Sequence, residues 1–213
     1  VLVLAQASSV FDKMAEIIQD EYGNQYYDPA GYTPDYLNSL EAPCEAFLLP
    51  LNYNIYNIQF VNFKIRCLDP GNEVSIFDIG AGDRPSPPPE GVAGTADQNR
   101  FIRYHFGPNL LQCEQIGTTL EFINGEYEVH NFRMIERHYF RGQLITSYDF
   151  NMPFVMPNSR NTWEMMYQNP LTSIPEWKEA LMTAPWEAKS DSFYFVNDTL
   201  IMHNRAEYNY SSS

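Results

Sequence analysis

The sequence predicts an antiparallel β-sandwich with a few short helices and an N-terminal extension. Three observations carry this prediction. Apolar and polar residues alternate in many short runs from about Ile55 to the C-terminus, and turn residues such as Gly, Pro and Asn separate the runs. Helical periodicity is confined to two short segments, near 9–21 and 173–181. Many short strands with one or two short helices are typical of a sandwich.

The first strands are expected in NIYNIQFVNFKIRCLD (54–69) and VSIFDI (74–79). The first run contains two offset alternations, which predict either a bulge near Val61 or two faces that are both partly covered. Residues 80–100 contain four Gly and four Pro, so we expect a long mobile loop there. RFIRYHF (100–106) is the next expected strand.

Turn signals define the remaining elements. Asn124-Gly125 lies between two alternating runs, which is the strongest short-range signal for a hairpin. A second hairpin is expected about Arg141-Gly142, with Pro153 interrupting pairing in its second strand, and a third about Asn197-Asp198. Residues 173–176 form a capping box with Pro175 near the start of a short helix.

The front of the chain is expected to be a separate element. Residues 1–45 hold eight acidic residues against one lysine, whereas residues 46–213 hold 19 acidic and 12 basic residues. We therefore divide the chain into an acidic N-terminal extension (1–45) and a β-sandwich domain (46–213). The extension is expected to contain a short amphipathic helix, with Gly23 as its stop. Its apolar stripe consists of Val10, Phe11, Met14, Ile17 and Ile18.

A helix of this length is marginal by itself, so something should cover its apolar face. We expect residues 1–31 to pack on a partner protein. Packing on the sandwich and a mobile tail are the alternatives.

Composition excludes several classes of function. The net charge of −14 argues against binding to nucleic acid and favours a basic protein or peptide as a charged partner.

Cys44, Cys67 and Cys113 are widely spaced without a CxxC motif, which predicts free thiols rather than disulfides or a metal site. VLVLAQASS at the start lacks the charged region of a signal peptide, so we expect a docked apolar terminus and a cytoplasmic location.

The run FRMIERHYF (132–140) is the main candidate for chemistry. In a strand, Phe132, Met134 and Phe140 share one face with Glu136 and His138. The other face carries arginines and is expected to meet water. Glu136 and His138 can be a satisfied structural pair, or the polar spot of an apolar binding cavity between two sheets. They can also be a general acid and base, but no nucleophile elbow, phosphate loop or paired metal motif accompanies them, so we expect no enzyme.

From Tyr32 onward the sequence resembles the Unc (uncoordinated, or retina-gene-four) family of acyl-binding lipid chaperones, which are relatives of the phosphodiesterase delta subunit. The matching stretches are YTPDYL (32–37), NIYNIQFVNFKIR (54–66), RFIRYHFGPNLL (100–111), VHNFRMIERHYFRGQLITSYDF (129–150), MPNSRNTWEMMY (156–167) and SDSFYFVNDTLIMHNRAEYNY (190–210).

The resemblance implies an immunoglobulin-like β-sandwich that is not an enzyme and needs no cofactor, with a fatty-acyl chain as its ligand. It implies that N-myristoylated or N-lauroylated proteins are the cargo, that Arf-like small GTPases release it, and that membrane contact is transient. The implied location is the cytoplasm, with the cilium or flagellum as its specialised part. The alternative is a divergent member built into a larger assembly as a structural subunit, with or without bound lipid.

The resemblance also assigns site residues. Phe63, Tyr104 and Tyr194 correspond to aromatic residues of the acyl pocket, and Glu136 and His138 to positions that contact the start of the acylated peptide. Leu110 stands where relatives tend to have Phe, which implies a wider or deeper pocket floor. No catalytic or metal-binding residue is expected.

Overall fold

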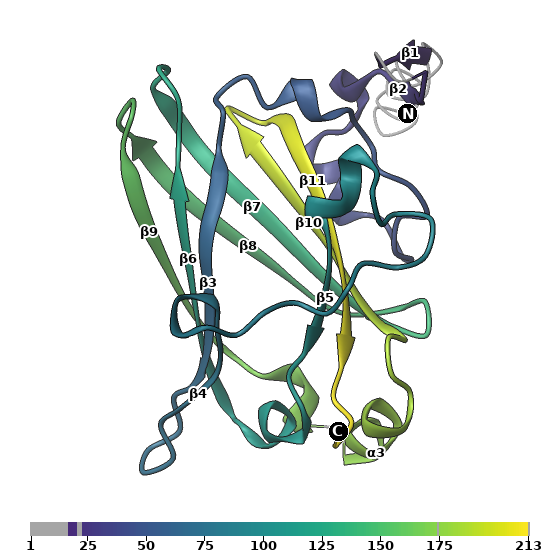
Figure 1. Cartoon of the computed structure of the whole chain (residues 1–213), viewed down its shortest axis with the longest axis vertical. Helices are drawn as coiled ribbons and strands as arrows, with labels where there is room; N and C mark the ends of the chain where they lie inside the picture. The colour runs from purple at the N-terminus through teal and green to yellow at the C-terminus, as the bar shows by residue number, and fades with distance from the viewer. Residues whose placement is uncertain (1–16, 21–22, 174, 213) are drawn as a thin grey trace, which may run out of the picture.

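Two β-sheets face each other and form the body of the molecule (Figure 1). The computed structural model describes residues 17–20, 23–173 and 175–212. The five-stranded sheet contains, in spatial order, β5 (Phe101–His105), β11 (Thr199–Asn209), β10 (Ala188–Val196), β7 (Val129–Phe140) and β8 (Gln143–Val155). The four-stranded sheet contains β4 (Val74–Asp78), β3 (Gln59–Cys67), β6 (Gln115–Ile123) and β9 (Arg160–Gln168). The predicted all-β sandwich is confirmed, and its pairing is antiparallel except between β11 and β5.

Short helices connect the strands. α3 (Pro175–Thr183) joins β9 to β10 at the end of the sandwich near the C-terminus, as the capping box predicted (Figure 1). The other helical segments are α2 (Pro34–Asn38) and the 3₁₀ helices η1 (Pro29–Gly31), η2 (Leu51–Tyr53), η3 (Ile79–Ala81), η4 (Ala96–Asn99), η5 (Pro108–Gln112) and η6 (Pro170–Ser173).

Several local predictions are confirmed. The register of β3 against β6 shifts between Phe60 and Asn62, which places a bulge at Val61. Two predicted hairpins form, and both central residues of each turn have positive φ: 51° and 78° at Arg141-Gly142, and 49° and 61° at Asn197-Asp198. Positive φ at both positions matches the twist of the flanking strands. Pro153 lies in β8, an edge strand, where a missing backbone donor is tolerated.

The hairpin predicted at Asn124-Gly125 is wrong. β6 pairs with β3 and β9, whereas β7 pairs with β8 and β10, so the turn crosses from one sheet to the other. The Asn124 side chain donates to the carbonyl of Met156 (2.9 Å) and accepts from the amide of Ser159 (3.2 Å), and the Gly125 amide donates to the carbonyl of Tyr56 (2.8 Å). These bonds to distant loops satisfy the turn, so no ladder between its flanking strands is needed.

The C-terminal part of the helix predicted for the extension is a strand instead. Ile17 and Ile18 lie in β1 (Ile17–Gln19), which pairs with β2 (Gln25–Tyr27). Gly23, with φ of +86°, belongs to the turn between these strands rather than to a helix stop. An Asp20 carboxylate oxygen accepts from the Asn24 amide (2.8 Å) and stabilises the same turn. Val10, Phe11 and Met14 lie outside the described residues.

The face of β7 expected to meet water is covered instead. Ile135, Arg137 and Tyr139 are at most 2% exposed, because residues 32–49 cross the outer face of the five-stranded sheet. We call residues 38–49 the strap. The packed sandwich therefore includes residues before 46. The apolar contacts beneath this segment join Tyr32, Leu37 and Leu49 to Ile135, Phe193, Phe195 and Leu200.

Candidate functional site

A cavity of about 780 Å³ lies between the two sheets. Its volume falls within the range of roughly 300–1,000 Å³ typical of ligand pockets. Aromatic and aliphatic side chains from both sheets form most of its wall, and polar or charged side chains, Arg100, Lys189 and Arg205 among them, form the rest. The structure brings all six site residues named from the sequence to this wall: Phe63, Tyr104, Leu110, Glu136, His138 and Tyr194.

Alternation along the strands positions these side chains. The even-numbered residues of β7 face the opposite sheet, and Phe132, Met134 and Phe140 are buried there as predicted. Phe63 of β3 meets Tyr104 of β5, with ring centroids 5.0 Å apart. This contact joins an inner strand of the four-stranded sheet to an edge strand of the five-stranded sheet.

Two aromatic groups occupy different parts of the cavity wall. Tyr194 of β10 contacts Phe60 at 5.0 Å and belongs to a separate core cluster from Tyr104. Leu110 lies in η5 and packs in the same cluster as Tyr104. The three predicted pocket aromatics therefore line one cavity without all touching one another.

Glu136 and His138 form the polar pair of the cavity. The Nε2 atom of His138 lies 3.5 Å from Oε1 of Glu136, and the side chains are 27% and 15% exposed, respectively. Burial raises the pKa of Glu136 to about 7, although bonds from Ser192 and Ser190 oppose the shift. Burial lowers the pKa of His138 to about 4. At neutral pH the histidine is uncharged and the carboxyl is close to half protonated, so the pair adds little charge to the apolar wall.

The hydroxyl groups of further tyrosines also line the cavity, at positions that no sequence motif indicated. Tyr148 and Tyr167 have ring centroids 4.5 Å apart, and the Tyr167 hydroxyl lies 3.0 Å from Oγ1 of Thr118. The Tyr208 hydroxyl lies 2.8 Å from Oγ of Ser190. Tyr148 pairs with Glu136 across the β7–β8 hairpin only because the register shifts at His138/Tyr139, so the sequence offered no signal for it.

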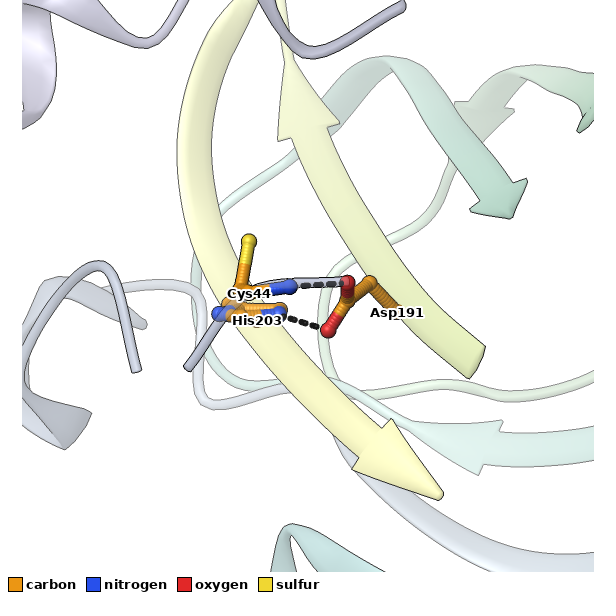
Figure 2. A group of neighbouring side chains, drawn as sticks. All are labelled: Cys44, Asp191 and His203. Atoms are coloured by element: carbon orange, nitrogen blue, oxygen red, sulfur yellow. Dashed lines mark hydrogen bonds and ion pairs between the residues drawn. The ribbon is translucent and has the colours of Figure 1, made fainter. Parts of the chain in front are cut away.

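A second polar cluster lies on the outer face of the five-stranded sheet. Figure 2 shows strap residue Cys44 beside Asp191 of β10 and His203 of β11. The Asp191 carboxylate accepts from the Cys44 amide (2.8 Å) and from Nε2 of His203 (3.0 Å). The other ring nitrogen of His203 accepts from the Leu48 amide (3.2 Å), so the ring proton resides on Nε2.

This arrangement makes the cluster an anchor rather than a reactive site. Both nitrogens of His203 are occupied, so the ring can neither take a proton from Cys44 nor ligate a metal without losing its bond to Leu48 or to Asp191. Burial raises the pKa of the Cys44 thiol, and a protonated thiol is a poor nucleophile.

Other buried charges hold the strap in the same way. Arg137 donates to the carbonyls of Asn38 (2.9 Å) and Leu40, and Arg100 donates to the carbonyl of Leu49 (2.7 Å). The partly buried Arg205 donates to the carbonyl of Glu45 (2.9 Å).

Together, the fold and the cavity define a β-sandwich protein with a mainly apolar pocket between its sheets. The family model described as the delta subunit of GMP phosphodiesterase (GMP-PDE) matches residues 52–210. Protein unc-119 homolog B of Danio rerio is 44% identical over 188 residues, covering 84% of this chain and 74% of that protein. Protein unc-119 of Caenorhabditis elegans is 39% identical over 180 residues (84% and 80%), and protein unc-119 homolog B of Homo sapiens is 42% identical over 183 residues (84% and 71%).

The chain therefore belongs to the Unc-119 and phosphodiesterase delta-subunit-like family, as its sequence motifs indicated. Among the described residues, the structure contains no helix long and apolar enough to cross a membrane.

Proposed function

We propose that the protein binds the acyl chain of N-myristoylated or N-lauroylated proteins between its sheets and carries them to or from membranes. The observation that carries this proposal is the 780 Å³ cavity with its apolar wall and single near-neutral acid–histidine pair. Family membership supports a lipid-binding or trafficking role in general.

The apolar wall supplies the affinity in this proposal. The acyl chain lies along Phe63, Tyr104, Leu110 and Tyr194. Each buried methylene contributes about 0.8 kcal/mol, so a myristoyl chain gains on the order of 10 kcal/mol before the entropic cost of ordering. Affinity then depends steeply on chain length.

The polar pair fixes the carbonyl end of the ligand. Neutral His138 can donate one hydrogen bond to the acyl carbonyl, and ionised Glu136 can accept one from the glycine amide. A buried amide without partners costs about 1–3 kcal/mol, so these bonds favour an acyl amide over a plain hydrocarbon.

No catalytic step is proposed. The Cys44–Asp191–His203 cluster has the residue types of a triad, but its hydrogen bonds hold the strap. Membership in a family of non-catalytic binders agrees with this.

On the resemblance, we further propose Arf-like GTPases as release factors and a cytoplasmic location that includes the cilium. A fixed structural subunit is the competing function. The cavity volume favours a ligand-binding carrier over a subunit whose interior is filled by its own side chains.

The proposal is tested by titrating the protein into fluorescent peptides that begin with myristoyl-, lauroyl- or acetyl-glycine and share one sequence. We expect tight binding of the long acyl chains and weak binding of the acetyl peptide. Equal affinity for all three peptides would refute the proposal.

A further inference from the structure

Two cysteines that are far apart in the sequence meet at one end of the sandwich. Cys67 is the last residue of β3, and Cys113 follows η5. Antiparallel pairing of β3 with β6 places Cys67 opposite Ile116, three residues after Cys113. Asp69 lies two residues beyond Cys67. The two sulfur atoms and an Asp69 carboxylate oxygen all lie within 4.8 Å of one another.

The two thiols are enclosed, hydrogen-bond to each other, and through Cys67 contact the Asp69 carboxylate. Cys67 and Cys113 are 0% and 1% exposed. The Cys113 thiol donates to the carbonyl of Asn109 at 3.3 Å, and the Asn72 amide group lies 3.9 Å from the Cys67 sulfur. Buried cysteines usually pack as small apolar residues. An acidic side chain beside two buried thiols is what distinguishes this cluster from ordinary apolar packing.

The carboxylate is oriented and kept ionised by the main chain. Asp69 accepts hydrogen bonds from the amides of Glu114 (3.0 Å to each oxygen) and Gln115 (2.8 Å to Oδ1). These bonds hold the pKa of Asp69 below its usual range. Outer-shell bonds of this kind are what fix a metal-ligating carboxylate. The Cys67 thiol also hydrogen-bonds the Asp69 carboxylate, so the carboxylate already points toward a sulfur atom.

We propose that Cys67, Cys113 and Asp69 form a binding site for Zn²⁺. Two sulfur donors and one carboxylate oxygen are ligand types that zinc takes, and enclosure is typical of structural zinc sites. The carbonyl of Asn109 and the side chain of Asn72 are the nearest groups for a fourth ligand. Ligands about 2.0–2.3 Å from a tetrahedral ion lie closer together than 4.8 Å, so binding draws the cluster inward.

Binding of the ion must release two protons, one from each thiol. The two thiolates and the carboxylate then carry three negative charges against two positive ones, leaving a net charge of −1 at the site. Affinity therefore falls steeply at acidic pH.

The site differs from the Cys44–Asp191–His203 cluster in the donor atoms that the main chain leaves open. There, the Leu48 amide occupies the unprotonated ring nitrogen of His203. At Cys67 and Cys113 no main-chain amide among the described residues donates to either sulfur. The site also has a structural consequence, because it joins the end of β3 to η5, which carries the cavity residue Leu110.

The experiment uses the whole chain, purified under reducing conditions, loaded with zinc sulfate and then desalted. Zinc per chain is measured by inductively coupled plasma mass spectrometry, and Co²⁺ replaces zinc in a parallel sample to reveal thiolate-to-cobalt absorption. We expect one zinc per wild-type chain and a thiolate–cobalt band. Asp69→Asn and Cys67→Ser should retain at least tenfold less zinc. Cys44→Ser, which removes a thiol elsewhere, should behave like wild type.

Thermal unfolding supplies an independent readout. Zinc should raise the Tm of wild type and of Cys44→Ser but not that of Asp69→Asn. Asp69→Asn retains an oxygen for the Glu114 and Gln115 amides, so it keeps the proposal testable if Cys67→Ser fails to fold. Zinc retention in wild type no greater than in Asp69→Asn would overturn the proposal. A Cys67–Cys113 disulfide in peptides from unreduced protein would also overturn it.

Discussion

Nε2 of His138 lies 3.5 Å from Oε1 of Glu136, and both side chains project from the same face of β7 into the cavity. Burial shifts the two pKa values in opposite directions, to about 7 for Glu136 and about 4 for His138. The pair can therefore offer hydrogen bonds inside an apolar cavity while carrying little net charge.

Removing either member should change ligand selectivity. Glu136→Ala is expected to weaken binding of a myristoyl-glycine peptide about tenfold, since a lost hydrogen bond costs roughly 1–2 kcal/mol. It should weaken free myristic acid less, because the free acid has no glycine amide. His138→Ala should weaken both ligands through the carbonyl. Calorimetric titration of each variant with both ligands measures the difference.

A stability measurement accompanies that test. If both variants bind the peptide like wild type and only unfold at lower denaturant concentration, the pair has a structural role alone.

The same pair predicts an unusual pH dependence of stability. The pKa of Glu136 is raised on folding from 4.5 to about 7, so ionisation destabilises the fold as pH rises from about 4.5 to 7. The pKa of His138 is lowered from 6.5 to about 4, so protonation destabilises the fold as pH falls from about 6.5 to 4. Between about pH 4.5 and 6.5 the two contributions nearly cancel.

Single substitutions should separate the two contributions. His138→Phe retains the Glu136 effect and should gain stability on acidification relative to wild type, by up to about 1.4 kcal/mol per pH unit. Glu136→Gln retains the His138 effect and should lose stability by a similar amount. Urea unfolding at pH 5, 6 and 7 gives both slopes. Parallel pH profiles for the two variants would contradict the assigned shifts.

Leu110 should set the usable length of the cavity. Leu110→Phe adds volume to a wall residue that is 4% exposed, so we expect the affinity for myristoyl peptide to fall more than that for lauroyl peptide. Two methylenes are worth about 1.6 kcal/mol, so the chain-length preference should change by up to roughly tenfold. Leu111→Met, a volume-conserving change at a neighbouring buried residue outside the cavity wall, is the control.

Asp191 should be essential for holding the strap. Asp191→Asn keeps the side-chain shape but removes the charge of a buried carboxylate. That carboxylate accepts hydrogen bonds from the Cys44 amide and from His203, and Arg205 lies 3.9 Å away. We expect a loss of about 3–5 kcal/mol in the free energy of unfolding, as for breaking other buried charge networks. Cys44→Ala should cost much less, because the backbone amide of Cys44 makes the bond to Asp191. Similar losses for both variants would argue against this anchor.

Local sequence determined much of this protein, because strand alternation and turn conformation depend on neighbouring residues. The alternation of Phe132, Met134, Glu136 and His138 was sufficient to place them on one face. The turns at Arg141-Gly142 and Asn197-Asp198 close their hairpins because both residues of each adopt positive φ.

The tertiary structure decided which elements meet. In a regular hairpin closed at Arg141-Gly142, Glu136 would pair with Ser147. The register instead shifts between His138 and Tyr139, and this shift brings Tyr148 opposite Glu136. Asn124-Gly125 has the composition of a hairpin turn and crosses between sheets, because its partners are loops far away in the sequence. No local pattern shows that the strap buries Arg137, or that Cys67 meets Cys113. Both depend on contacts between segments separated by tens of residues, whose energies are set by packing rather than by local conformation.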